Sequence, residues 1–179
     1  MSISRSNRLL DDPVGEEGFR ALMANFPSSV TIVTTIGAGG LPHGLTCSSL
    51  ASVSLRPPTL LVCVRSTSPT LAAIVHSGTL AVNLLHAGAQ AEAELFSSGT
   101  PDRFSRVDWA QPAGAGGPHL VAAAHLVADC RVSDTKQVGD HVVVFGEVLG
   151  VATCAVGERR PLLYGMRCYV AWSPEPPLQ

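Results

Sequence analysis

The sequence predicts a mainly β fold, a small antiparallel barrel whose ends are closed by a few short helices. Segments rich in Val, Ile and Thr recur between Gly and Pro turn signals, and they outnumber the helical segments. The strands also follow one another instead of alternating with helices, as they would in a doubly wound sheet. At 179 residues, 46% hydrophobic and 15% charged, the chain is long enough for one well-buried domain.

The boundaries of the elements follow from periodicity and from turn residues. Apolar residues at helical spacing predict a first helix, which Pro27 ends. Ser68 and Pro69 are typical of a helix start, and Gly78 is typical of a helix end. The predicted elements, in chain order, are helix 16–25, strand 29–36, a returning strand 43–54, strand 59–64 buried on both faces, helix 69–77, strand 79–85, helix 89–96, and strands 119–133, 141–151 and 162–172.

Composition excludes several classes of function. The formal net charge is −2 and basic runs are absent, which argues against a nucleic-acid or anionic membrane surface. No apolar run reaches membrane-spanning length and residues 1–12 do not have the order of a signal peptide, so we expect a cytoplasmic protein. Five cysteines without C-x-x-C and six scattered histidines predict reduced thiols and no metal site. We expect residues 1–13 to be a flexible arm, 14–173 the domain and 174–179 a tail.

The run from His43 to Ser54 is the first candidate site. Read as one strand, it places the side chains of Thr46, Ser48 and Ser52 on one polar face, with Leu50 between them. Such a face of small hydroxyls suits a flat, uncharged ligand. A packed strand whose hydroxyls are satisfied by its neighbours is an equally good explanation of this run alone.

Further segments favour the explanation that the hydroxyl face binds a ligand. The turn from Arg65 to Thr70 joins a cation and several hydroxyls to a predicted helix N-terminus, where a phosphate binds well. Gly139-Asp-His141 opens a strand, and the long connection 97–118 contains Phe104 and Trp109. Taken singly, the turn is explained by an ordinary capped helix, the Gly139-Asp-His141 motif by a polar strand end, and the connection by a packed loop. Together they indicate a nucleotide cofactor lying across a barrel, without the G-x-G-x-x-G unit of a Rossmann fold.

The chain resembles the flavin reductase family, whose fold is the FMN-binding split barrel, from about Phe19 to Tyr169. The resemblance is carried by ordered motifs: Phe26-Pro-Ser-Ser-Val-Thr-Ile-Val-Thr-Thr35, Gly44-Leu-Thr-Cys-Ser-Ser-Leu-Ala-Ser-Val-Ser54, Val82-Asn83, Asp102-Arg-Phe104, Gly139-Asp-His141 and Pro161-Leu-Leu-Tyr164. It implies a split antiparallel β-barrel that reduces FMN or FAD with NADH or NADPH as hydride donor. It also implies a homodimer that passes reduced flavin transiently to a separate monooxygenase component.

The resemblance also implies roles for individual residues. His141 is expected beside the nicotinamide and the flavin, as the catalytic residue that positions the nicotinamide. The implied flavin contacts are Thr46, Cys47, Ser48, Ser49 and Ser52 around the ring, Arg65, Ser66, Ser68 and Thr70 near the phosphate, Asn83 close by, and Phe104 over the site. Two departures stand out: Cys47 replaces a common alanine, and Arg65-Ser66 replaces an Asn-Lys pair.

Three other functions remain open at this stage. A split-barrel oxidase acting on another substrate would hold its flavin tightly. A non-enzymatic flavin-binding protein would bind flavin without accelerating NAD(P)H oxidation, and a structural or interaction module would not bind it.

Overall fold

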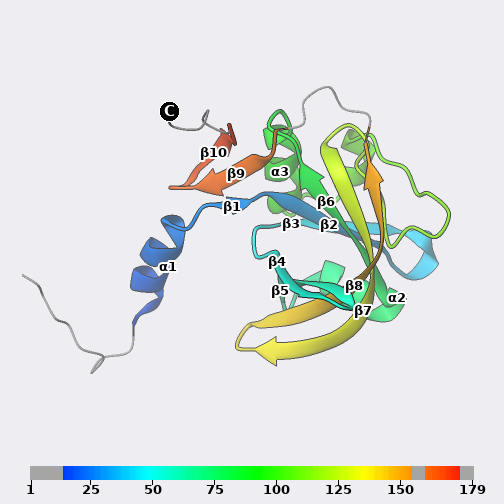
Figure 1. Ribbon diagram of the computed structural model, residues 1–179, viewed down its shortest axis with the longest axis horizontal. Helices are drawn as coiled ribbons and strands as arrows, with labels where there is room; N and C mark the ends of the chain where they lie inside the picture. Colours follow the sequence, from blue (N-terminus) through cyan, green and yellow to red (C-terminus); the bar gives the residue numbers. More distant parts are fainter. Residues whose placement is uncertain (1–13, 155–159, 174–179) are drawn as a thin grey trace, which may run out of the picture.

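The computed structural model describes residues 14–154 and 160–173, and the expected arm (1–13) and tail (174–179) lie outside these ranges. It contains the mainly β architecture predicted from the sequence, a split antiparallel barrel (Figure 1). In the described residues no helix is long and apolar enough to span a bilayer. The elements are α1 (Glu16–Ala24), β1 (Ser28–Ser29), β2 (Thr31–Ile36), η1 (Ala38–Gly40), β3 (Pro42–Cys47), β4 (Ala51–Leu55), β5 (Pro58–Arg65), α2 (Pro69–Ser77), β6 (Thr79–Leu85), α3 (Gln90–Ser97), η2 (Arg103–Arg106), β7 (Ala124–Val138), β8 (His141–Thr153), β9 (Leu162–Gly165) and β10 (Cys168–Ala171).

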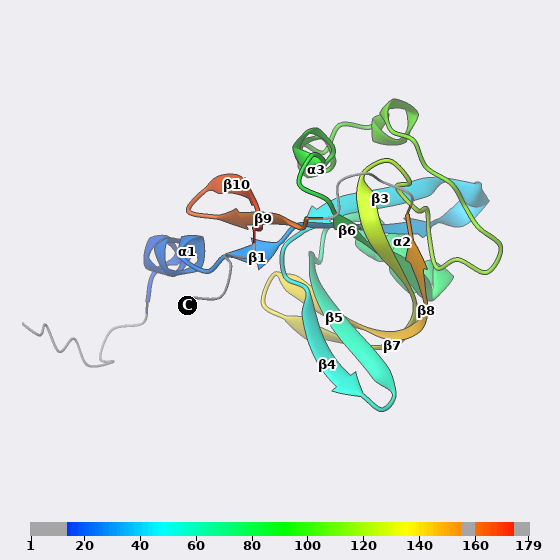
Figure 2. The ribbon, with the colours of Figure 1, turned by 45° about the horizontal axis from the view of Figure 1, so that its top comes forward.

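Seven strands form the barrel in the order β3-β2-β6-β7-β8-β5-β4, and each pairs antiparallel with its neighbours. β3 and β4 are therefore the two edges of this sheet, although they are consecutive in the chain. Residues 48–50 cross from one edge to the other, where no strand pairing closes the barrel. This opening is the split of the barrel, and Figure 2 shows the strands curving toward it.

The two faces of β2 are both buried, and this places a helix on each side of the strand. Val33 belongs to the barrel core, into which α2 inserts Leu71 and Ile74. Ile32 belongs to a second core outside the barrel wall, where it packs with Phe96 of α3. The alternating side chains of one Val- and Thr-rich strand thus fix both helices next to the split.

Four expectations about the elements are wrong. The run 43–54 is two strands with different partners, because residues 48–50 change from the β2 side of the sheet to the β5 side. The segment 162–172 is a hairpin, β9–β10, and the strand expected from His119 begins at Ala124 instead. β5 is not buried on both faces, because only Val62 and Val64 are buried along it, on the barrel interior.

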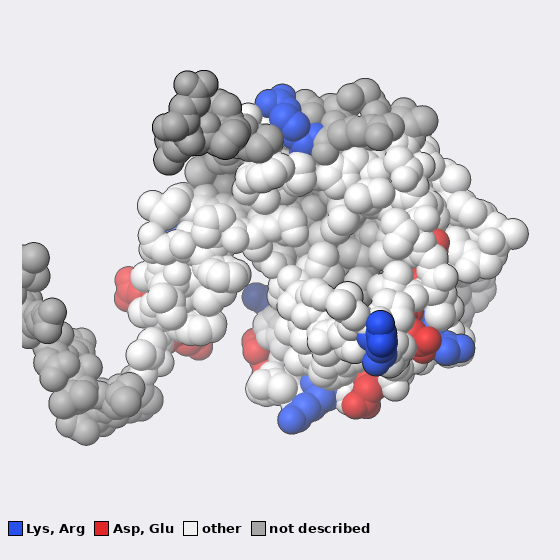
Figure 3. Space-filling view, viewed as in Figure 1, with Lys and Arg blue, Asp and Glu red and all other residues white. Residues whose placement is uncertain are grey.

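Helix α1 and the small sheet β1-β9-β10 lie beside the barrel instead of within it (Figures 1 and 2). The apolar face predicted for the helix exists, but no residue of α1 is buried. Phe19 is 56% exposed and Leu22 is 65% exposed. Figure 3 shows acidic side chains at the edges of the α1 region and uncharged atoms over most of its visible surface.

Candidate functional site

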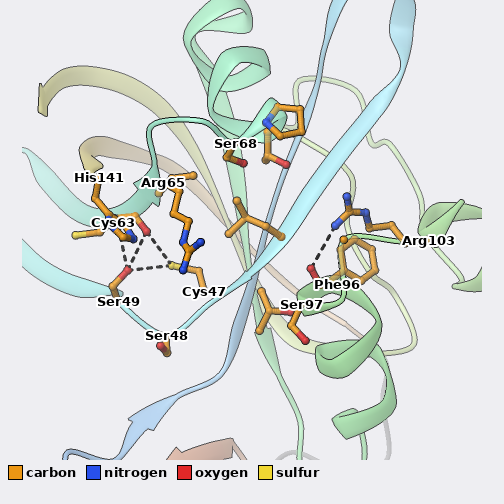
Figure 4. A pocket seen from close by; sticks show the side chains of 16 residues that line it. Cys47, Ser48, Ser49, Cys63, Arg65, Ser68, Phe96, Ser97, Arg103 and His141 are labelled. Atoms are coloured by element: carbon orange, nitrogen blue, oxygen red, sulfur yellow. Dashed lines mark hydrogen bonds between the residues drawn. The ribbon is translucent and has the colours of Figure 1, made fainter. Parts of the chain in front are cut away.

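The split of the barrel opens into a cavity of about 770 Å³. Its walls come from the end of β3 and the crossing segment, the end of β5 with the start of α2, the end of α3 with the loop after it, and the start of β8 (Figure 4). The lining residues are Leu45, Thr46, Cys47, Ser48, Ser49, Cys63, Val64, Arg65, Ser68, Pro69, Thr70, Phe96, Ser97, Gly99, Arg103 and His141. The structure therefore brings together eight of the twelve residues predicted from the sequence.

The crossing segment presents polar groups that no strand uses. Residues 48–50 belong to no strand, and among the described residues no turn or loop hydrogen bond joins their main chain to another main-chain group. Ser49 holds the segment to β5, because its hydroxyl donates to the carbonyl of Cys63 at 3.1 Å and accepts from the amide of Cys63 at 3.1 Å. The hydroxyl of Ser48 is exposed at the cavity. The segment is therefore pinned to β5 while the hydroxyl of Ser48 stays available to a ligand.

Thr46 and Cys47 line the cavity from positions fixed by packing. The hydroxyl of Thr46 donates to the carbonyl of Ala93 in α3 at 2.6 Å, so this side chain is already engaged. Cys47 is 4% exposed, belongs to the barrel core, and its sulfur lies 3.2 Å from the Ser49 hydroxyl. Burial raises the pKa of the Cys47 thiol, which stays neutral near pH 7. Cys47 is thus a small core residue at the edge of the site.

The end of β5 and the start of α2 form the polar wall opposite. Ser68 occupies the N-cap position of α2, as predicted, but its side chain makes no capping hydrogen bond. The hydroxyl and the first-turn amides of the helix thus remain available at the cavity, beside Arg65 and the buried Thr70. Such a helix start attracts anions through its N–H groups and its dipole.

His141 enters the cavity from the start of β8, directly opposite Arg65 in the β5–β8 ladder. Its Nδ1 lies 2.8 Å from Oδ1 of Asp140, which leaves Nε2 for a ligand. The hydrogen bond from His141 lowers the pKa of the Asp140 carboxyl. The turn itself is fixed to the β5–α2 loop, because the amide and the hydroxyl of Ser66 both donate to the carbonyl of Asp140.

Four predicted contacts do not line the cavity, and each has a structural reason. Ser52 lies on β4, beyond the point where the chain changes partner, and Ser66 is engaged with Asp140. Phe104 packs edge-on against Phe96, with ring centroids 5.1 Å apart, behind the wall of the site.

Asn83 is the clearest correction, since its side chain is buried in the fold away from the cavity lining. It is 0% exposed, and its Nδ2 donates to the carbonyl of Ile32, to Thr34 Oγ1 and to the carbonyl of Pro118. Its Oδ1 accepts the amide of Leu120 at 2.8 Å. Asn83 therefore anchors the end of the long connection 98–123 to the barrel.

A hydrogen bond between His119 and Asp129 adds a second anchor for the same connection. Nε2 of His119 lies 2.9 Å from Oδ1 of Asp129 in β7, and that oxygen also accepts the amide of Gly116. Gly116 and Gly117 press so closely on the backbone of Leu80 and Thr34 that neither position has room for a Cβ atom. The connection is a tightly held part of the site.

Sequence reasoning missed several lining residues, of which Arg103 and Phe96 are the most consequential. Arg103 lies in the Asp102-Arg-Phe motif, but no local pattern shows that it reaches the same cavity as Arg65. Phe96 had the helical spacing of an ordinary core residue. A second cavity of about 260 Å³ adjoins the first and is lined by Tyr164 and Tyr169 of the small sheet, together with Thr46, Ser48 and Ser97 from the first.

Comparison with known proteins agrees with this geometry. The model of the flavin reductase like domain matches residues 23–173. A "Flavin reductase (NADPH)" from Lentzea aerocolonigenes is 48% identical over 156 residues, which cover 87% of this chain and 89% of the relative. The reductase subunit HsaB of a flavin-dependent monooxygenase from Rhodococcus jostii is 38% identical over 88% of this chain and 78% of its own.

A solved structure is similar over nearly the full length. The NADH:FAD oxidoreductase SgcE6 of Streptomyces globisporus C-1027, in complex with NAD and FAD fragments, superposes with a TM-score of 0.82 at 30% identity. The match covers 93% of this chain and 98% of that one. On its sequence and its fold, the chain belongs to the flavin reductase like domain family.

Proposed function

We propose that this protein is an NAD(P)H-dependent flavin reductase that reduces FMN or FAD and supplies the reduced flavin to a separate monooxygenase component. Relatives named as flavin reductases and as monooxygenase reductase subunits support this proposal. The single observation that carries it is the cavity at the split. The uncharged residues Thr46 to Ser49, with the exposed hydroxyl of Ser48, form one wall, the start of α2 with Arg65 forms another, and His141 also lines the cavity.

The residues of the cavity fit a bound flavin. Residues 46–49 would lie along the isoalloxazine ring, where main-chain amides and the hydroxyl of Ser48 would meet its polar edge. The start of α2 would hold the phosphate, with Ser68, Thr70 and Arg65 as donors. Among the described residues that line the cavity there is no carboxylate to repel the phosphate or the negative charge of reduced flavin.

The chemistry of the reaction belongs to the two ligands, a hydride passing from C4 of the nicotinamide to N5 of the flavin. The chain has to hold two rings in contact, exclude water and offset the charge that the flavin gains. The dipoles of residues 48–50 are already in place for the last task, because Ser49 pins the segment to Cys63. A site of this kind needs no strong general base.

His141 is proposed to position the nicotinamide through Nε2. We expect His141→Ala to slow hydride transfer roughly tenfold to a hundredfold while the dissociation constant of flavin stays within about twofold. Stopped-flow mixing of NAD(P)H with the flavin-loaded protein measures this step directly. An unchanged rate in a single turnover would remove this role from His141.

The proposed activity is tested by NADH and NADPH oxidation with and without added FMN, FAD or riboflavin. Stimulation only by added flavin supports the reductase. An oxidase on another substrate would keep its flavin through purification, and a non-enzymatic binder would not accelerate NAD(P)H oxidation. Riboflavin serves as a matched control, since it lacks the phosphate: a higher KM for riboflavin than for FMN supports the phosphate position at α2.

We infer that a second copy of this chain covers α1. Phe19, Leu22 and Phe26 (64% exposed) are large apolar side chains that the barrel leaves open. Tyr164 and Trp172, in the small sheet and just after it, are exposed as well. Light scattering on the wild type and on Leu22→Lys tests the homodimer: the wild type should have twice the chain mass, and the variant should dissociate. A wild-type monomer would refute it.

A further inference from the structure

Two arginines enter the cavity from separate walls, and the proposed flavin site uses one of them. Arg65 lies at the end of β5, next to the start of α2. Arg103 lies on η2, in the connection between α3 and β7. In the view of Figure 4, Arg65 lies near Cys47 and His141, whereas Arg103 lies on the other side, beside Phe96. The charge of Arg103 therefore needs its own explanation.

The guanidinium of Arg103 is held in place but largely unsatisfied. Its Nη1 donates to the carbonyl of Phe96 at 3.2 Å, and its central carbon lies 5.8 Å from the centroid of the Phe96 ring. Across the part of the chain that the structure describes, no carboxylate pairs with it. An arginine has five N–H donors, so most of them remain for a ligand.

The surroundings of Arg103 favour an anionic ligand. Partial burial lowers the pKa of this guanidinium, which shows that the cation has lost part of its hydration without gaining a carboxylate. The loss is offset when a phosphate or diphosphate enters the cavity, because an arginine binds these groups through two parallel hydrogen bonds. The connection that carries Arg103 is also held firmly to the barrel, by Asn83 and by the His119–Asp129 pair.

We propose that Arg103 binds the diphosphate of the nicotinamide dinucleotide, so that the cavity holds two anionic ligands on two separate cations. This inference rests on the proposed function. Hydride transfer requires the two rings in contact, and both ligands carry phosphate, so their anionic parts must be kept apart within one cavity. The α2 start with Arg65 takes the flavin phosphate, and Arg103 takes the dinucleotide, whose nicotinamide reaches His141.

The test compares Arg103→Gln and Arg103→Lys with Arg106→Gln. Arg106 lies on the same short helix, is exposed and does not line the cavity, so its variant matches the change in charge without touching the site. Arg103→Gln should raise the KM for NAD(P)H by about tenfold to a hundredfold, the range for losing a charged hydrogen bond. The KM of Arg103→Lys should lie between those of the wild type and Arg103→Gln, because lysine keeps the charge but cannot form the two parallel hydrogen bonds of a guanidinium. Arg106→Gln should stay within about twofold of the wild type.

Flavin binding distinguishes this inference from its alternatives. In Arg103→Gln the dissociation constants of FMN and FAD, measured by flavin fluorescence, should stay within about twofold of the wild type. Weaker binding of FAD alone would assign Arg103 to the second phosphate of FAD and overturn the proposal. An unchanged KM for NAD(P)H in Arg103→Gln would also overturn the proposal, as would an equal rise of this KM in Arg103→Gln and Arg106→Gln.

A measurement on the wild type avoids any variant that fails to fold. With FMN saturating, inorganic diphosphate should compete with NAD(P)H, and non-competitive behaviour or no inhibition overturns the proposal. Failure of the proposed function is a separate result: a wild type that shows no flavin-stimulated NAD(P)H oxidation removes the reductase itself. If the wild type oxidises NAD(P)H in the presence of flavin but diphosphate does not inhibit it, only the proposed role of Arg103 is refuted.

Discussion

Replacing Asn83 should unfold the protein more easily without weakening flavin binding. In Asn83→Ala the amide of Leu120 loses its acceptor, in a position where Leu120 is 0% exposed. A buried donor without a partner costs about 1–3 kcal/mol. The other lost bonds cost less, because Thr34 Oγ1 still donates to the carbonyl of Pro118 at 2.6 Å. We therefore expect a loss of about 2–4 kcal/mol in the free energy of unfolding.

Asn83→Asp separates the hydrogen-bonding role from simple loss of volume. A carboxylate retains an acceptor for the Leu120 amide, but its second oxygen then faces the carbonyls of Ile32 and Pro118, where Nδ2 now donates. Burying that charge among acceptors is unfavourable, so Asp should destabilise more than Ala. Asn25→Ala is the control, because Asn25 is exposed and makes one local bond to Ala21; its effect should stay below about 0.5 kcal/mol.

Urea unfolding, followed by far-ultraviolet circular dichroism, measures the stability of each variant, and flavin fluorescence titration measures binding below the transition. The anchoring role predicts a lower transition midpoint with a dissociation constant for FMN within about twofold of the wild type. An Asn83→Ala protein of wild-type stability that binds FMN tenfold more weakly would refute it. That outcome would restore Asn83 as a flavin contact, the role suggested by the resemblance.

Two further predictions concern the connection and the barrel core. Gly117→Ala should lower the free energy of unfolding by about 1–3 kcal/mol, because its Cβ would meet the backbone of Thr34 and Thr35. Gly150 has open space around it, so Gly150→Ala should change the free energy of unfolding by less than about 0.5 kcal/mol. Equal urea midpoints for the two variants would contradict the close packing. Burial, with the charge of Asp129, raises the pKa of the Cys130 thiol to about 12 from 9.0. The unfolded chain therefore loses this proton first, and stability should fall as the pH rises from about 9 toward 12. In thermal-melting experiments across this range, the melting temperature of Cys130→Ala should fall less steeply with pH than that of the wild type. Cys168→Ala, which changes an exposed thiol, is the control and should keep the wild-type slope. Identical slopes for all three proteins would exclude Cys130 as the source of the fall.

The sequence by itself predicted most of the helices and strands and eight of the residues that line the cavity. Its Val-, Ile- and Thr-rich segments and its Ser68-Pro69 and Gly78 signals depend on neighbours along the chain, and such local preferences survive in any fold. The cluster of hydroxyls, the helix start and His141 were found for the same reason, since each is a short motif that carries its own chemistry.

Only the tertiary structure decided how the chain uses those motifs. The change of partner at residues 48–50 depends on β2 and β5, which no local pattern relates to each other, and this change turned one predicted strand into two strands with the cavity between them. The same holds for Asn83, whose partners lie 35 to 51 residues away and make it an anchor. Arg103 faces the same cavity as Arg65 because the fold brings together two residues that lie 38 positions apart in the chain. Hydrogen-bond partners and charges at such separations are brought together by the closure of the barrel, and no local sequence pattern predicts them.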